Sequence, residues 1–131
     1  MAETRKIIFV CEHGAAKSIV AATYFNKLAQ EKGLLAQALA RGTNPDLGLS
    51  AYAVAGLLED GLTPSQLTPE KLMPEQIEAA DVVVSFCELP GVDLEENHIA
   101  YWHNVPAVSE DYKKARDMIL VRIQDMLKDL T

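Results

Sequence analysis

The sequence has few cysteines, and fewer basic than acidic side chains. Two cysteines, Cys11 and Cys87, are too few for the disulfide framework of a small secreted domain. The first residues, MAETRKIIFV, lack the long apolar stretch of a secretory signal, so we expect an intracellular, cytoplasmic protein. No apolar run reaches the roughly 18 residues that span a bilayer, and the net charge of -7 is atypical of nucleic-acid-binding domains. We therefore expect no membrane and no nucleic-acid partner.

What is present suits one α/β domain. Hydrophobic residues make up 49% of the 131 residues, enough for a single core over residues 1–131. Short β-branched or apolar runs predict strands at Lys6–Val10, Ala36–Ala40, Val82–Phe86 and His98–Trp102. Helical spacing and capping residues predict helices over Ser18–Glu31, from a cap at Ser50 to about Asp60, from Thr68, and over Asp111–Leu130. Because strands alternate with helices, we expect a parallel sheet covered by helices on both faces.

The stretch CEHGAAKS, residues 11–18, joins the first strand to the first helix. Cys11 falls at the carboxyl end of the strand, where open parallel sheets bind ligands. The small residues at 14–16 let the backbone curl around a tetrahedral oxyanion, and the helix N-terminus attracts anions and favours a thiolate. Ser18 is placed to cap the helix and to donate its hydroxyl to the thiolate. The stretch predicts a reactive thiol beside an oxyanion site, and the alternative is a buried cysteine with a solvated Lys17.

This stretch resembles the C-x-x-N-x-x-R-S motif of the low-molecular-weight protein tyrosine phosphatases and the thioredoxin-linked arsenate reductases that share their fold. The segments ARGTNPD, AVAGLLEDGL, DVVVSFC, YWHNVP and YKKARDMILVRI are similar in the same order, so the resemblance spans nearly the whole chain. It implies a three-layer α/β/α fold with a four-stranded parallel sheet and Cys11 as nucleophile, assisted by Lys17 and Ser18. The implied oxyanion cradle is the loop of Glu12, His13, Gly14, Ala15, Ala16 and Lys17.

Three positions depart from the family pattern. Lys17 replaces the loop arginine, so a point charge replaces a two-pronged grip on the anion. Gly14 replaces the asparagine, which we expect to be benign because glycine adopts the left-handed conformation. Val105 precedes Pro106 where the family has the aspartate that protonates the leaving group. The side chains that could replace this acid are Glu110, Asp111, His103 and His13.

Two further residues have a functional and a structural interpretation. Arg41, at the end of the second strand, would compensate for Lys17 by binding the anion, or it is a surface arginine at a turn. Cys87 corresponds to a cysteine with which arsenate reductases attack an intermediate, or it is a buried core residue. The chain has no third cysteine to complete such a relay, so an external thiol must do so. No spacing of histidine and cysteine suggests a metal site, and we expect no cofactor.

These observations leave several functions open. The first is an attenuated cysteine-dependent phosphatase, or an arsenate reductase that uses an external thiol. The second is a non-catalytic module that binds an oxyanion or a phosphoprotein. A weaker third is a redox sensor in which Cys11 and Cys87 form a reversible pair. The expected partners are phosphate, arsenate or a similar oxyanion, with a phosphorylated protein or an external thiol reductant.

Overall fold

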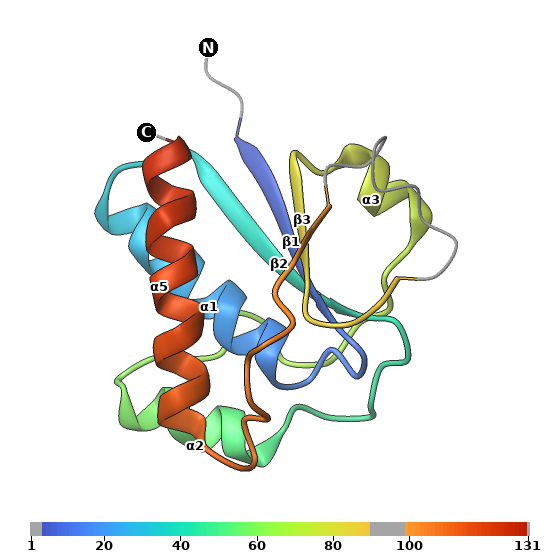
Figure 1. Cartoon of the computed structure of the whole chain (residues 1–131), viewed down its shortest axis with the longest axis vertical. Coiled ribbons are helices and arrows are strands. Elements are labelled where there is room, and N and C mark those ends of the chain that lie inside the picture. Colours follow the sequence, from blue (N-terminus) through green and yellow to red (C-terminus); the bar gives the residue numbers. More distant parts are fainter. Residues whose placement is uncertain (1–3, 90–98, 131) are drawn as a thin grey trace.

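The computed structural model describes residues 4–89 and 99–130. The described strands and helices follow one another along the chain in the predicted order (Figure 1). The strands are β1 (Arg5–Cys11), β2 (Ala36–Gly42), β3 (Val82–Ser85) and β4 (Ile99–Tyr101). The helices are α1 (Lys17–Glu31), α2 (Ala51–Glu59), α3 (Pro74–Ala79) and α5 (Tyr112–Leu130). His98, predicted to begin the fourth strand, lies outside the described residues.

The four strands form one parallel sheet in the order β2-β1-β3-β4. β1 pairs with β2 from Arg5 opposite Ala36 to Cys11 opposite Gly42, and with β3 on its other side. β2, the next strand along the chain, lies on one side of β1, and β3 lies on the other side. The carboxyl end of β1 is therefore the switch point of the topology, where open α/β sheets bind their ligands. Cys11 is the last residue of this strand.

Side chains of β1 alternate between two hydrophobic clusters, which explains the layers. Ile7 and Phe9 belong to the cluster that includes α1, α2 and α5. Ile8 and Val10 pack on the other face with residues around α3, including Ile77. The predicted three-layer α/β/α fold with a four-stranded parallel sheet is confirmed (Figure 1). None of the described helices is long and apolar enough to cross a bilayer.

The helix predicted from Thr68 is wrong. Glu70 and Leu72 instead make backbone hydrogen bonds with Gly42, at the end of β2, so this stretch is extended. The helix α3 begins only at Pro74, and the backbone N–H of Met73 donates to Gln76 Oε1 at 2.9 Å. A long-range pairing that local sequence does not reveal has overridden the Thr-Pro-Glu signal. By contrast, Ser50 caps α2 as predicted, accepting from the N–H of Ala53.

The outer edge of β2 is occupied by side chains from elsewhere in the chain. The amide of Asn26, on α1, accepts from the Ala38 N–H at 2.7 Å and donates to the Ala38 carbonyl at 3.0 Å. Gln66 Oε1 accepts from the Ala40 N–H at 3.2 Å. These groups satisfy backbone atoms that an edge strand otherwise leaves unpaired.

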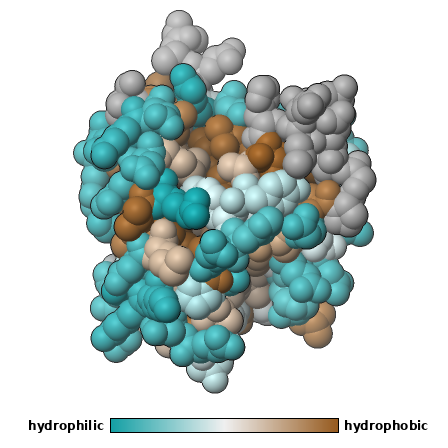
Figure 2. All heavy atoms as spheres, viewed as in Figure 1, coloured by the Kyte–Doolittle hydropathy of each residue, from teal (hydrophilic) through white to brown (hydrophobic). Residues whose placement is uncertain are grey.

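A polar cluster around Asp60 ties α1, α2 and α5 together. Asp60, after α2, accepts hydrogen bonds from Tyr24 at 2.5 Å, Tyr112 at 2.8 Å and Arg116 at 2.9 Å. Burial raises the pKa of Tyr24 to about 12, and its hydrogen bond to Asp60 acts in the same direction. Burial alone would raise the pKa of Asp60, but these three donors lower it below its ordinary value. On the face of the molecule shown in Figure 2, most of the surface is hydrophilic.

Candidate active site

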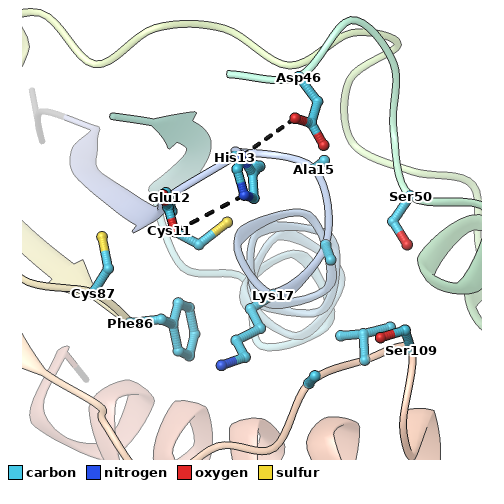
Figure 3. Close-up of a pocket in the computed structure, with 13 residues that line it drawn as sticks. Cys11, Glu12, His13, Ala15, Lys17, Asp46, Ser50, Phe86, Cys87 and Ser109 are labelled. Atoms are coloured by element: carbon cyan, nitrogen blue, oxygen red, sulfur yellow. Dashed lines mark ion pairs between the residues drawn. The ribbon is translucent and has the colours of Figure 1, made fainter. Parts of the chain in front are cut away.

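A cavity of about 330 Å³ opens at the carboxyl end of β1 (Figure 3). One wall is the loop between β1 and α1, which contributes Cys11 and most of the residues after it. The other walls are three segments far away in sequence: Asp46 and Ser50, Phe86 and Cys87, and residues 107–109. The predicted loop thus lines a cavity at the predicted end of the sheet, and its partner segments come from the loops after β2, β3 and β4.

Cys11 lies at the wall of this cavity and is 9% exposed. Its Sγ atom is 3.0 Å from the hydroxyl of Ser18, a residue that is fully buried. The expected contact between the two side chains is therefore present. The expectation that Ser18 also caps α1 is wrong, because the helix begins one residue earlier, at Lys17, with Ala16 at the cap position. The Ser18 hydroxyl therefore contacts the Cys11 sulfur and makes no capping hydrogen bond to the helix backbone.

The loop is held in place by contacts with the segment that follows β2. Gly14 has a φ of 62°, the left-handed conformation expected for it. A Cβ atom at Gly14 would lie 2.8 Å from the backbone nitrogen of Gly42. Backbone N–H groups of Thr43, Asn44 and Asp46 donate in turn to the carbonyls of residues 11, 12 and 13. Two backbones therefore meet where only glycines fit, which fixes the shape of the loop.

Lys17 supplies positive charge to the cavity. It is the first residue of α1, and its side chain lies between Phe86 and Ser109 in the view of Figure 3. Among the described residues that line the cavity, it alone carries a permanent positive charge. The partial positive charge of the α1 N-terminus points to the same place. The arrangement favours an anion beside Cys11, with one ammonium group instead of a guanidinium.

The predicted anion-binding residues divide into two groups. Glu12, His13, Ala15, Ala16 and Lys17 line the cavity. Gly14 and Arg41 do not: Gly14 packs against β2, and the Arg41 guanidinium donates to the Ala40 carbonyl at 2.7 Å and pairs with Glu70 at 3.1 Å. Arg41 is 8% exposed, so its interpretation as a surface arginine is wrong. Its role as an anion ligand is not supported either, because the guanidinium is engaged outside the cavity.

Cys87 lines the same cavity as Cys11 and is half-buried. Its Sγ atom is 3.6 Å from the Ser85 hydroxyl. Burial raises the pKa of the Cys87 thiol, and the negative charges of Cys11 and Glu12 act in the same direction. Cys87 is therefore a protonated thiol at neutral pH, available at the cavity but less reactive than a thiolate.

The loop after β4 forms a wall of the cavity without contributing an acid. Val105 is 5% exposed, belongs to the hydrophobic core and does not line the cavity. His103, Glu110 and Asp111, three of the acids considered from sequence, do not line the cavity either. The fourth, His13, does. Its Nδ1 atom is 3.2 Å from Asp46 Oδ1.

Sequence reasoning missed Asp46, Ser50, Phe86 and residues 107–109 as parts of the site. A signal was available, because the loops after all strands of a parallel sheet meet at one edge, and Asp46 lies in the turn-rich stretch after the second strand. Within the described part of the chain, no group of three or more histidine, cysteine or carboxylate side chains is arranged to hold a metal ion.

Comparisons with known proteins agree with this geometry. A family model described as low molecular weight phosphotyrosine protein phosphatase matches residues 6–126. No curated protein sequence matches the chain.

Three solved structures illustrate the shared fold. A YwlE mutant from Bacillus subtilis superposes with a TM-score of 0.82 at 19% identity, over 96% of this chain and 98% of that one. A low molecular weight protein tyrosine phosphatase from T. tengcongensis gives 0.78 at 20% identity, over 96% and 99%. A thioredoxin-dependent arsenate reductase from Corynebacterium glutamicum gives 0.74 at 20% identity, over 98% of this chain and 63% of that one.

Proposed function

The chain belongs to the low molecular weight phosphotyrosine protein phosphatase family, and from this premise we propose that it is a cysteine-dependent phosphatase of attenuated activity. Its substrates are phosphate monoesters, phosphotyrosine among them. The observation that carries the proposal is the position of Cys11, at the wall of the cavity with its sulfur 3.0 Å from the Ser18 hydroxyl.

The reaction begins with the Cys11 thiolate attacking phosphorus. The Ser18 hydroxyl donates a hydrogen bond to the sulfur, which favours the thiolate and improves it as a leaving group in the second step. The α1 N-terminus and Lys17 stabilise negative charge on the phosphoryl oxygens. Water then displaces the sulfur from phosphorus and releases phosphate.

Two features attenuate this activity. Lys17 offers a point charge where an arginine would grip two oxygens, and the loss of one such donor typically costs about 10²–10³ in rate. The buried Val105 cannot protonate the leaving group, and the loss of a general acid typically costs about 10²–10⁴. Unless another residue supplies the proton, substrates with good leaving groups should be hydrolysed far better than phosphotyrosine.

A second candidate function is arsenate reduction, favoured by the presence of Cys87 in the same cavity. In this scheme Cys11 displaces water from arsenate, and Cys87 attacks the Cys11 sulfur. Arsenite leaves with the electron pair of the sulfur–arsenic bond, and a Cys11–Cys87 disulfide forms. Because the chain has no third cysteine, an external dithiol must reduce that disulfide.

One set of assays separates these functions. Para-nitrophenyl phosphate hydrolysis and dithiol-dependent arsenate reduction are measured for the unmodified protein, Cys11→Ser and Cys87→Ser. A phosphatase loses hydrolysis in Cys11→Ser only, whereas a reductase loses arsenate reduction in both variants. If the unmodified protein shows neither activity, yet phosphate shifts the amide NMR signals of residues 12–17, the chain is a non-catalytic module for an oxyanion or a phosphoprotein.

A further inference from the structure

One candidate for the missing proton donor lies at the cavity. Of the four acids that the sequence offers, only His13 lines the cavity with Cys11. We propose that His13 protonates the leaving group and that Asp46 positions it, an inference that rests on the proposed phosphatase function. His13 is then a catalytic residue and Asp46 a positioning residue.

The contacts of the imidazole define which nitrogen carries the proton to be transferred. Nδ1 is 3.2 Å from Asp46 Oδ1 and 3.3 Å from the carbonyl oxygen of Asn44, so it faces two acceptors and must itself carry a hydrogen. Nε2 is the nitrogen left for the substrate. It is 3.9 Å from Glu12 Oε2, so carboxylates lie on both sides of the ring. In Figure 3 the ring lies between these two carboxylates.

The backbone holds His13 at the mouth of the cavity. Its carbonyl accepts from the Asp46 N–H at 3.0 Å, so the residue that orients the ring is also tied to its backbone. The next residue, Gly14, is pressed against Gly42. The His13 side chain is 51% exposed, so a leaving group and a water molecule can reach the imidazole.

The charge of the cavity makes a protonated His13 useful for binding as well. A Cys11 thiolate, Glu12 and Asp46 carry three negative charges, and Lys17 carries the opposing positive one. Lys17 and the α1 N-terminus favour a phosphoryl dianion here, and an imidazolium at His13 offsets part of the opposing negative charge. Cys87 adds none, because burial raises the pKa of its thiol. Anion binding and His13 protonation should therefore favour each other.

The proton and the bonds balance over two steps. In the first, the Cys11 sulfur bonds to phosphorus, the bond from phosphorus to the leaving oxygen breaks, and the Nε2 proton passes to that oxygen. In the second, water attacks phosphorus while neutral His13 takes its proton, the sulfur–phosphorus bond breaks, and the thiolate and phosphate are restored. The cycle needs no oxidant or reductant.

The test compares leaving groups. Hydrolysis of dinitrophenyl, nitrophenyl and phenyl phosphate is measured against pH for the unmodified protein, His13→Asn, Asp46→Asn and His103→Asn. His103 is the matched control, because it is equally exposed and pairs with Glu88 outside the cavity. We expect His13→Asn to lower kcat/KM about 10²-fold or more for phenyl phosphate and by a much smaller factor for dinitrophenyl phosphate. The rate of the unmodified protein should fall at high pH, where His13 no longer carries the proton that it transfers. His13→Asn should remove this fall.

Asp46→Asn should lower kcat/KM mainly for phenyl phosphate, because the imidazole loses one of the two acceptors that orient it at Nδ1, and His103→Asn should change neither readout. Equal losses for all three esters in His13→Asn, or no loss, would overturn the role of His13 while leaving the phosphatase function intact. If the unmodified protein hydrolyses no ester, both proposals fail.

NMR titration of the His13 ring gives a readout independent of turnover and of any folding defect in the variants. Its pKa should rise when inorganic phosphate is added, and an unchanged pKa would also overturn the proposal.

Discussion

Replacing Gly14 with alanine tests whether the loop around Cys11 is fixed by its contact with β2. The new Cβ would lie 2.8 Å from the Gly42 nitrogen, which itself donates to the Glu70 carbonyl at 2.9 Å. A left-handed conformation costs a non-glycine residue about 1–2 kcal/mol, and overpacking against a fixed backbone costs about 1–3 kcal/mol. Gly14→Ala should therefore lower the free energy of unfolding by about 2–5 kcal/mol, as the sum of these two effects.

Gly33 provides the matched control, because its φ is 69° and a Cβ there would meet nothing within 4 Å. Gly33→Ala should cost only the conformational part, about 1–2 kcal/mol. Gly48→Ala, in open space without a positive φ, should be close to neutral. Urea unfolding of the three variants measures the difference. If Gly14→Ala is no more destabilising than Gly33→Ala, the two backbones do not meet as closely as described.

Four other predictions concern separate features. Asp60→Asn should lower the free energy of unfolding by about 1–3 kcal/mol, measured in urea, because it weakens the shared acceptor of three partly buried hydrogen bonds. Tyr24 has a raised pKa, so its contribution to stability is complete below its ordinary pKa of 10.0 and is lost as pH rises towards 12; thermal unfolding across this range should show the loss. Limiting iodoacetamide should label Cys11 before Cys87, as read by mass spectrometry, because burial keeps the Cys87 thiol protonated. Lys17→Arg should raise nitrophenyl phosphate hydrolysis by up to about 10²-fold; an unchanged rate would mean that the cavity cannot align a guanidinium with the phosphoryl oxygens.

The parts of the site that follow from local sequence could be predicted, and those that depend on burial could not. Cys11 and Ser18 are seven residues apart on a strand, a tight loop and a helix, so their meeting follows from short-range geometry. Arg41 looked exposed because a turn follows it, but segments distant in sequence cover it. The Thr68 helix signal failed for the same reason, since pairing with the end of β2 determines the conformation there.

The side chains that occupy the outer edge of β2 bear on whether the protein aggregates in concentrated solution. Edge strands commonly discourage intermolecular strand addition with lysine, proline or a bulge. The middle of β2, from Gln37 to Ala40, has none of these, and Leu39 on it is 37% exposed. The side-chain amides of Asn26 and Gln66 discourage strand addition instead, because they are hydrogen-bonded to backbone groups that a second chain would bind. Resistance to aggregation on this side of the molecule therefore depends on two uncharged side chains, and it should be insensitive to pH and salt.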